Sequence, residues 1–370
     1  LGVHWLGAHW HEFRAIRVSD GWRLRVPAVP TAFVWMAVLG PVIWYALTPW
    51  YWFDTWARVK WYLEFHLQHV NYFVQYFGEN VQNPPLPISY PWVMTAVTVP
   101  AAILVAAAVG GGRAWREWDG RAWVGRWSQA VRDLRLPRSL GARPATGWLL
   151  VLNLLFPIVL ISLPSVPIFG GTKHWMTAMP FLAIFAGGGV GCAAGTVAEA
   201  IDERVGSVPR PAGLALAGGL CLTTVLGPSA YATAHIHPFE TGYYNSLIGS
   251  VRGAADAGML RQFWGYASRQ GLPWLNEHAP KGAQVWTGNT TGYAWWFYQD
   301  AGWARGDLRR GSRAGSDFGL FHHQKSFAAD RVELWSEYGT YTPEHVVSVE
   351  GVPMLSIYAR PGTDESSGSP

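Results

Sequence analysis

Charge and cysteine are both scarce in this chain of 370 residues: Asp, Glu, Lys and Arg make up 14% of it, and it holds two cysteines. So low a charge excludes an intrinsically disordered protein and a long coiled coil, because both depend on many charged residues. Cys192 and Cys221 lie inside apolar runs, so no disulfide framework is expected. No short Lys- and Arg-rich block with interleaved aromatic residues is present, and a nucleic-acid partner is therefore not expected.

Apolar residues and tryptophan are abundant instead: half of the chain is hydrophobic and 23 residues are Trp. Indole rings gather at the two interfaces of a membrane, and a helix of about 20 apolar residues is long enough to cross it. Pro and Gly inside such a helix are tolerated. We therefore predict a polytopic α-helical membrane protein, with transmembrane helices at about 31–48, 91–110, 147–163, 175–196 and 211–233.

The distribution of Lys and Arg predicts the orientation of these helices. Basic residues concentrate in segments 1–30, 111–146 and 197–210 and are few in the short segments between the other helices. Short loops rich in Lys and Arg stay in the cytoplasm. Residues 1–233 are then the transmembrane region, and residues 234–370 form an extracytoplasmic α/β domain. The strongest signal for the cytoplasmic side is a group of arginines: Arg113, Arg116, Arg121, Arg126, Arg132, Arg135, Arg138 and Arg143. These arginines form either a solvated basic face or a binding site for a ligand.

The segment between the first two predicted membrane helices is typical of an amphipathic surface helix at about 54–77. Apolar residues recur at spacings of three and four, polar residues form the opposite stripe, and aromatic rings crowd its start. Such a helix lies along a membrane with its rings at the level of the lipid headgroups. Four polar residues on or beside it are candidates to line a site: Asp54, Arg58, His66 and His69.

Asp54 and Arg58 also have an alternative, purely structural role. Asp54 is well placed as a helix N-cap and as a partner of Arg58 four residues further on. His66 and His69 are three residues apart and could face one site. No carboxylate or cysteine accompanies the two histidines at ligand spacing, so no metal ligand is assigned.

The loop at 164–174 ends in Lys173 and His174, directly before the fourth predicted membrane helix. A lysine acts as a point charge and a histidine can add a hydrogen-bond donor, so the pair suits a phosphate group at the headgroup plane. A lysine that extends from a helix end to the membrane interface is the alternative.

From about residue 261 the pattern changes to that of a small α/β domain. It contains no GxGxxG, P-loop, GxSxG or HExxH motif. His322 and His323 follow a predicted strand and could reach a cleft, with a place in the core or on the surface as the alternative. Hydrophobic patterning predicts strands at 283–287, 318–321, 346–349 and 354–358, and helices at 261–279 and 326–338.

Three stretches carry a resemblance to a known family: TPWYWFDTWARVKWYLEFHLQHVNYFVQYFGENVQNPPLPISYP at 48–91, FGGTKHWMTAMPFLAIFAG at 169–187 and HPFETGYYNSLIGSVRGAADAGMLRQFWGYA at 237–267. They resemble the C-terminal two-thirds of bacterial membrane glycosyltransferases of family 39. These enzymes belong to the GT-C class, and their relatives include protein O-mannosyltransferases and aminoarabinose transferases. The resemblance covers almost all of residues 30–360.

The resemblance implies an inverting transfer of a hexose or pentose from a polyprenyl-phosphate carrier to a lipid, polysaccharide or protein acceptor outside the cytoplasm. It implies no nucleotide sugar and allows a divalent cation. In the family, an acidic residue of the first outer loop is the base; that loop is expected upstream of Leu1, so no catalytic residue is assigned. Lys173 and His174 match a family position and are expected to bind the donor phosphate. The residues that match the family's surface helix are Asp54, Arg58, His66 and His69.

Two other classes of protein fit the hydropathy pattern. A transporter of lipid or sugar usually has charged residues within its membrane helices and inverted repeats, and the sequence shows neither. A non-catalytic membrane scaffold would use the C-terminal α/β domain for binding. An acidic pair in an upstream outer loop would favour the enzyme over the scaffold.

Overall fold

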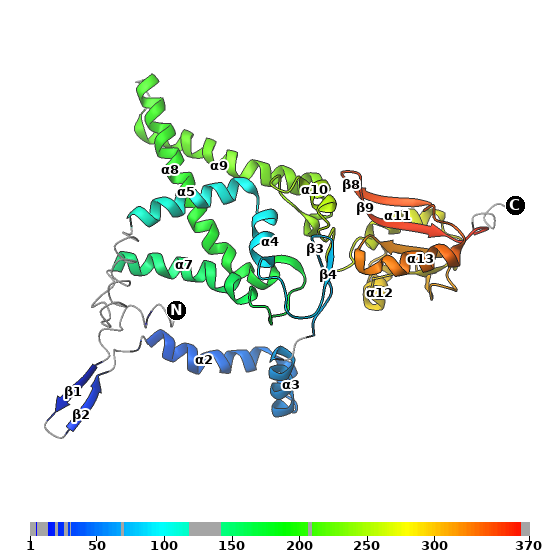
Figure 1. The fold of residues 1–370 in the computed structure, drawn as a ribbon, viewed down its shortest axis with the longest axis horizontal. Coiled ribbons are helices and arrows are strands. Elements are labelled where there is room, and N and C mark those ends of the chain that lie inside the picture. The colour runs from blue at the N-terminus through cyan, green and yellow to red at the C-terminus, as the bar shows by residue number, and fades with distance from the viewer. Residues whose placement is uncertain are drawn as a thin grey trace.

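The computed structural model is mostly helical, with a small sheet near the C-terminal end of the chain (Figure 1). It describes residue 5 and residues 14–18, 21–25, 29, 31–67, 70–117, 142–205 and 209–363; for 14–18, 21–25, 117, 142–146, 205 and 210 it describes the backbone alone. We call the described residues of 31–236 the helical part and residues 268–363 the cap. A hairpin of β1 (Arg14–Val18) and β2 (Gly21–Arg25) precedes the helical part.

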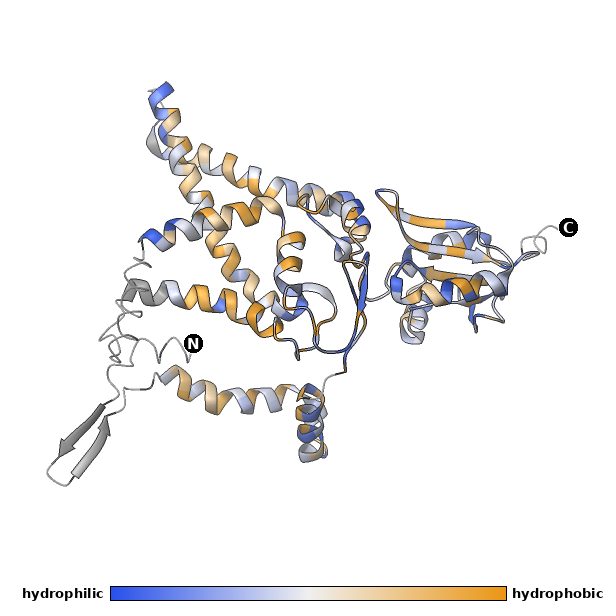
Figure 2. Ribbon diagram, viewed as in Figure 1, coloured by the Kyte–Doolittle hydropathy of each residue, from blue (hydrophilic) through white to orange (hydrophobic). Residues whose placement is uncertain are grey.

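The helical part is apolar along much of its length (Figure 2). Two segments, Gly171–Arg204 and Pro211–Ile236, are long and apolar enough to cross a membrane, and a bent pair of helices raises the number to three. Thr31–Leu47 and Gly147–Ile161 are shorter apolar helices. Five crossings therefore stay a prediction. The helices are α2 (Thr31–Leu47), α4 (Tyr90–Thr98), α5 (Ala101–Glu117), α7 (Ala142–Ile161), α8 (Met179–Val205) and α9 (Arg210–Ile236).

The second predicted membrane helix, 91–110, is not one straight helix. It is divided into α4 and α5, and the two are bent by 109° relative to each other. The division falls at Val99, whose backbone is extended, and Pro100. Proline has no backbone N–H and disfavours helical backbone in the residue before it, so the sequence itself breaks the helix here.

Asn245, from the chain that follows α9, satisfies the carbonyl groups that this break leaves free. Its Nδ2 donates to the carbonyls of Ala96 and Val99 at 2.7 and 2.6 Å, and its backbone N–H donates to the carbonyl of Val97 at 2.7 Å. The side chain is 2% exposed. Buried backbone carbonyls need partners, so this one residue fixes the bend.

Helices α5 and α8 pack at backbone distance because glycine lies at their contact. A Cβ atom added at Gly110 would lie 1.9 Å from the carbonyl oxygen of Phe185, and one added at Gly189 would lie 1.9 Å from that of Ala106. No side chain fits there. Small residues that let helix backbones approach are typical of membrane helix pairs.

The predicted surface helix at 54–77 is wrong in its second half. Helix α3 (Thr55–Leu67) ends at Leu67, and a hairpin of β3 (Val74–Tyr76) and β4 (Glu79–Val81) follows. Phe77 and Gly78 connect the two strands with positive φ angles of 46° and 78°, as a tight hairpin turn requires. The apolar residues here alternate along a strand with a period of two instead of following the helical period. A short 3-10 helix, η2 (Pro49–Tyr51), precedes α3.

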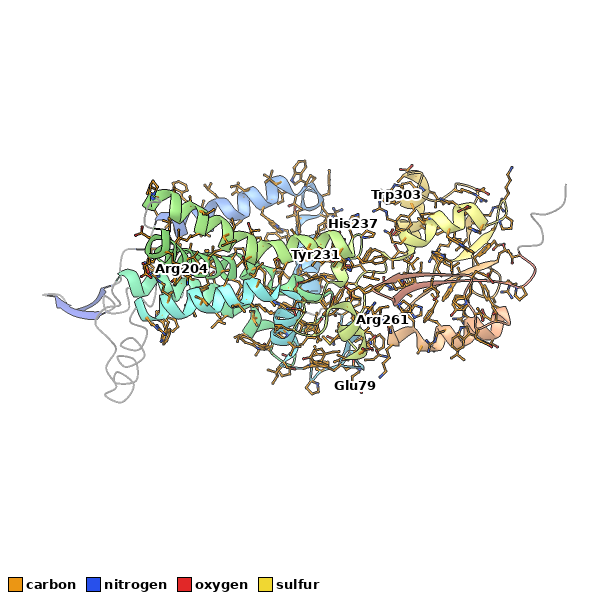
Figure 3. All side chains as sticks on the ribbon, turned by 90° about the horizontal axis from the view of Figure 1, so that it is seen from above. Glu79, Arg204, Tyr231, His237, Arg261 and Trp303 are labelled. Atoms are coloured by element: carbon orange, nitrogen blue, oxygen red, sulfur yellow. The ribbon has the colours of Figure 1, made fainter. Side chains whose placement is uncertain are left out.

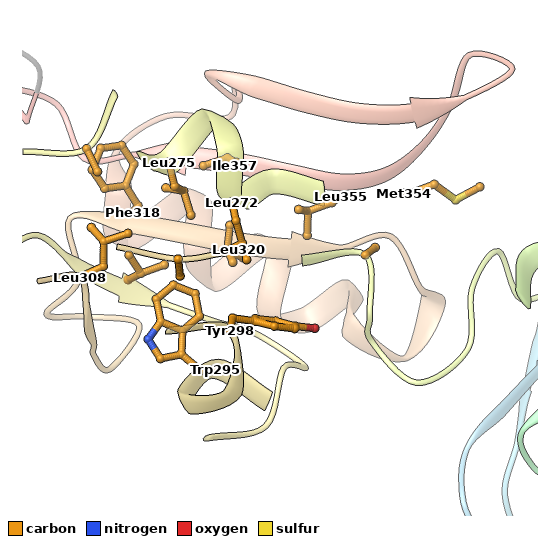
Figure 4. Close-up of a cluster of buried hydrophobic side chains, with 14 of the residues drawn as sticks. Leu272, Leu275, Trp295, Tyr298, Leu308, Phe318, Leu320, Met354, Leu355 and Ile357 are labelled. Atoms are coloured by element: carbon orange, nitrogen blue, oxygen red, sulfur yellow. The ribbon is translucent and has the colours of Figure 1, made fainter. Parts of the chain in front are cut away.

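The cap is a five-stranded mixed sheet in the order β6-β5-β7-β9-β8. Side chains of β7 alternate between the two faces: Phe318 and Leu320 pack with residues of α11 and α12, as Figure 4 shows, whereas Phe321 packs with α13. The strands are β5 (Gln284–Trp286), β6 (Arg309–Arg310), β7 (Phe318–His322), β8 (His345–Val349) and β9 (Val352–Ala359). The helices are α11 (Ser268–His278), α12 (Gly292–Asp300) and α13 (Ala328–Tyr338), and α10 (Ser250–Asp256) precedes the cap.

The cap agrees with most of the elements predicted for it. Strands predicted at 283–287, 318–321, 346–349 and 354–358 are confirmed by β5, β7, β8 and β9, and the helix predicted at 326–338 by α13. The helix predicted at 261–279 begins only at Ser268. Helix α12 and strand β6 were not predicted.

Candidate functional site

A cavity of about 560 Å³, which we call the membrane-side cavity, lies where α4, α5 and α8 meet the chain that follows α9. Charged residues enter it from two short 3-10 helices, η3 (Gly171–Ala178) and η4 (Glu240–Gly242). The helices supply an apolar wall, which fits a hydrophobic ligand with one polar group. The apolar residues of this wall are Met94, Val99, Pro100, Ile103, Met176, Met179, Leu182 and Ala183.

Lys173 lines this cavity between two aromatic rings. Its Nζ lies 4.0 Å from the ring centroid of Phe169 and 4.1 Å from that of Trp264. A cation over the face of an aromatic ring is attracted by the electrons of the ring. Two rings from distant parts of the chain therefore hold the lysine charge in place without neutralising it.

The local sequence explains why Lys173 takes this position. Gly170 and Gly171 both have left-handed backbone, with φ of 63° and 66°. A Cβ atom at Gly170 would come within 2.7 Å of the Trp264 ring and 2.9 Å of the Lys173 side chain, so glycine is needed there. Trp175, which is fully buried, ties η3 to α4 because its Nε1 donates to Oγ1 of Thr95 at 2.8 Å.

Glu240 is the carboxylate that lines the membrane-side cavity within the described chain. A hydrogen bond from its own backbone N–H, and then its contact with His237, hold the pKa of this carboxyl below its usual value. The carboxylate accepts from Nδ1 of His237 at 2.5 Å. Glu240 is therefore ionised at neutral pH, and the cavity holds one positive and one negative group.

A second cavity of about 610 Å³, which we call the cap-side cavity, shares part of its lining with the first. Gly170, Phe263 and Trp264 line both cavities. The polar residues of this second cavity are amides, a hydroxyl and a carboxylate: Gln262, Asn289, Gln324, Ser326 and Asp330. Its aromatic residues are Tyr72, Phe73, Phe169, Phe263, Trp264 and Phe327. Aromatic faces with amide side chains suit a neutral, hydroxyl-rich ligand such as a sugar.

The structure separates the residues that the sequence placed together at one site. Lys173 lines the membrane-side cavity, whereas His174 is not part of its lining and stands edge-on to Phe169 at 4.4 Å. Arg58 donates to the carbonyl of Trp50 and lies over its ring, 5.0 Å from the centroid.

Two further predicted residues of the surface helix, Asp54 and His66, make contacts of their own. Asp54 accepts from the backbone N–H of Arg58 through its own backbone carbonyl, and its φ of 52° is left-handed. His66 packs edge-on against Tyr62 at 4.3 Å. His69 lies outside the described residues. The lining of the two cavities includes neither Asp54 nor His66.

Two residues of the site were not predicted, Trp264 and Glu240. Both belong to the stretch at 237–267 that carried the family resemblance, but neither has a local pattern that marks a function. Trp264 has a positive φ of 72°, which is unusual for a bulky residue and helps to aim its ring at Lys173.

Within the part of the chain that the structure describes, no group of three or more His, Cys, Asp or Glu side chains is placed to hold a metal ion. No protein-family model, curated protein or solved structure matches this chain.

Proposed function

We propose that the protein is a membrane glycosyltransferase that moves a sugar from a polyprenyl-phosphate donor to an acceptor outside the cytoplasm. The observation that carries this proposal is the position of Lys173, held between Phe169 and Trp264 at the edge of a cavity with an apolar wall. A lipid-linked phosphate needs both features at once: a cation for its headgroup and an apolar surface for its chain.

The charge on Lys173 is available to a ligand. In the described chain, no ion pair joins Lys173 to an acidic residue. Its two ring contacts stabilise the ammonium without supplying hydrogen-bond acceptors for its three donors. A phosphate oxygen would fill that role, and charge-assisted hydrogen bonds to phosphate are among the stronger ones in proteins.

The surface of the helices supports a location in the membrane. Helix α2 has no buried residue, and along α9 Leu216 and Leu220 are 64% and 59% exposed. In water such a surface would be an exposed apolar patch that drives association. In a bilayer it contacts lipid chains, and the orange helices of Figure 2 form a layer beside the cap. The arginine-rich segments, which are expected on the cytoplasmic side, favour an extracytoplasmic position for the cap.

The cap-side cavity is the proposed place for the acceptor. It shares the Trp264 wall with the membrane-side cavity, so a sugar bound to a phosphate at Lys173 would lie beside an acceptor hydroxyl. A bond then forms between the acceptor oxygen and the anomeric carbon, and the bond from that carbon to the phosphate oxygen breaks. The phosphate leaves with the electron pair, and Lys173 stabilises its charge. The hydroxyl proton passes to a carboxylate, the base that the family resemblance implies.

The test is the affinity of the purified chain in detergent for a polyprenyl monophosphate. We expect Lys173→Ala to raise Kd at least about tenfold, which corresponds to about 1.4 kcal/mol, and Lys173→Arg to retain most of the affinity. Lys281→Ala, which removes an exposed cap lysine, is the control and should change nothing. Equal Kd values for Lys173→Ala and the unmodified chain would refute the proposed donor site.

A further inference from the structure

A third cavity, separate from the membrane-side cavity, gathers positive charge. This cleft of about 290 Å³ lies where the hairpin β3–β4 meets the cap, near the junction at which Figure 3 labels Arg261 and Glu79. It is lined by Gln75, Arg261, Phe321, His323, Gln324, Lys325, Ala328 and Arg331. Three of these residues are permanent cations at neutral pH, and none is acidic. We call it the basic cleft.

The three cations are held by neutral groups and not by carboxylates. Nη1 of Arg261 donates to the carbonyl of Pro353 at 3.0 Å, and Nζ of Lys325 donates to the carbonyl of Gly78. The guanidinium of Arg331 lies 5.0 Å from the ring centroid of Trp335. Within the described chain, no ion pair involves any of the three.

Arg331 has an unmet hydrogen-bonding capacity inside the structure. Its Nε is buried and has no partner among the described residues. The neighbouring carboxylate, Asp330, is directed elsewhere: it accepts from Nη1 of Arg313 at 3.1 Å. A buried donor on a charged group is costly to leave unpaired, and the cleft beside it has room for an acceptor.

The positive charges of the cleft also repel one another, which makes the charged form of each group less stable. Burial and then the charge of Arg331 lower the pKa of Arg261, and the carboxylate of Asp256 acts in the opposite direction. Burial, then Arg261 and Arg331, lower the pKa of His323 to about 4. Like charges gathered at this density are unfavourable unless an anion joins them. The first turn of α13 adds to the field, because Ala328 lines the cleft and helix N-termini attract anions.

We propose that the basic cleft binds a phosphate group. Two guanidinium groups can each offer paired N–H donors to phosphate oxygens, and the lysine adds a point charge. The cleft is at the small end of ligand cavities, which fits a phosphate with a short substituent. The phosphate belongs either to the headgroup of an anionic membrane lipid beside the hairpin or to a soluble or acceptor-borne phosphate. The site does not depend on the proposed donor site at Lys173.

The first experiment titrates inorganic phosphate into the full chain in detergent and follows its melting temperature. Because Lys173 would also attract phosphate, the titration is done in the Lys173→Ala background. We expect phosphate to stabilise this protein, and Arg331→Gln combined with Lys325→Gln to weaken binding at least tenfold. Arg331→Lys, which keeps the charge, should lose less, and Arg309→Gln, which removes an exposed cap arginine, should bind as before.

The second experiment separates the two sources of phosphate. The same variants are placed in nanodiscs of phosphatidylcholine with or without phosphatidylglycerol, and retained lipid is identified by native mass spectrometry. Selective retention of phosphatidylglycerol that Arg331→Gln with Lys325→Gln abolishes assigns the cleft to a lipid headgroup. Binding of inorganic phosphate without lipid selectivity assigns it to a soluble or acceptor-borne phosphate. Absence of both effects in variants whose circular dichroism and melting are unchanged would overturn the proposal.

Discussion

The helical part and the cap are held together in opposite ways. Where α5 meets α8, glycine lets two backbones approach so closely that a single added methyl group at Gly189 would lie 1.9 Å from a carbonyl oxygen. In the cap, large side chains fill the space: Phe318 and Leu320 are fully buried between the sheet and the helices on one face (Figure 4). The helix contact depends on residues without side chains, whereas the cap core depends on large side chains that fill the space.

The difference follows from what surrounds each region. Large apolar side chains on α2 and α9 are exposed, and under the proposed membrane location they contact lipid, where hiding them against another helix gains little. Helix contact there depends on close backbone approach. Under the same proposal the cap faces water, and each Å² of apolar surface that it buries contributes roughly 25 cal/mol to its stability. The hydrophobic effect therefore holds the cap but not the helix contact.

The strongest test of this comparison adds a methyl group to the helix contact in one variant and removes methyl groups from the cap core in another. Gly189→Ala adds one methyl group to the helix contact and should cost more than about 3 kcal/mol, because the atom it meets is backbone and cannot move aside. Leu320→Ala removes methyl groups from the cap core and should cost about 3 kcal/mol. Amide hydrogen exchange by mass spectrometry, which resolves each helix and strand, should show faster exchange in α5 and α8 for the first variant and in β7 and α11 for the second.

The control for Gly189→Ala is Gly191→Ala, because a Cβ atom at Gly191 meets nothing within 4 Å. It lies on the same helix as Gly189 and should leave exchange in α5 and α8 unchanged. If Gly191→Ala disturbed α8 as much as Gly189→Ala, the disturbance would not come from the contact between Gly189 and the carbonyl of Ala106, and the close contact would have no special importance.

A smaller effect is expected where a polar side chain holds the bend between α4 and α5. Asn245→Ala leaves the carbonyls of Ala96 and Val99 without their side-chain donor inside the helical part, and we expect a loss of about 2 kcal/mol. The melting temperature of the protein in detergent and faster exchange at 96–103 are the readouts. Asn80→Ala, on the exposed turn side of the hairpin, should have no measurable effect. Equal melting of both variants would show that water or detergent caps the bend.

The sequence predicted those parts of the fold that depend on local pattern. Strands such as β7 and β9 were predicted because their apolar runs are short and bounded by turn residues. The bend at Pro100 was not, because proline is tolerated inside membrane helices and the residue that holds it open, Asn245, lies far along the chain. The change from helix to hairpin after Leu67 was missed because aromatic residues there fit both periods.

The candidate site shows the same limit. Lys173 could be predicted because a cation at the start of a membrane helix is conspicuous, but the two rings that enclose it come from Phe169 and from distant Trp264. The basic cleft had no signal in the sequence, since Arg261 and Arg331 are brought together only by the folded cap. Charges that are scattered along a chain reveal a site only when tertiary structure is known.

The smallest predicted effect is a pH dependence that belongs to the cap alone. His322 is 2% exposed, and burial, with a contribution from His323, lowers its pKa to about 4. Its ring lies 3.4 Å from Nε2 of Gln262 and 3.5 Å from Oγ1 of Thr290, so the neutral form is the one that the cap accommodates. The unfolded chain, whose histidine titrates near its ordinary value, binds more protons between about pH 4 and 6.5 than the folded cap does.

Cap stability should therefore be complete above about pH 6.5 and fall as the pH decreases towards 4, by about 1 kcal/mol between pH 7 and pH 5.5 from His322. In His322→Gln the side chain has a similar size but does not titrate. The stability of this variant should therefore fall by about 1 kcal/mol less than that of the unmodified protein between pH 7 and pH 5.5. His323 is present in both proteins, so the difference isolates His322. Hydrogen exchange in β7 and β9 should report the change while α5 and α8 stay constant. An equal decline in both proteins, or a decline shared by the helical part, would remove His322 as the cause, because only the water-facing cap holds this buried, neutral ring.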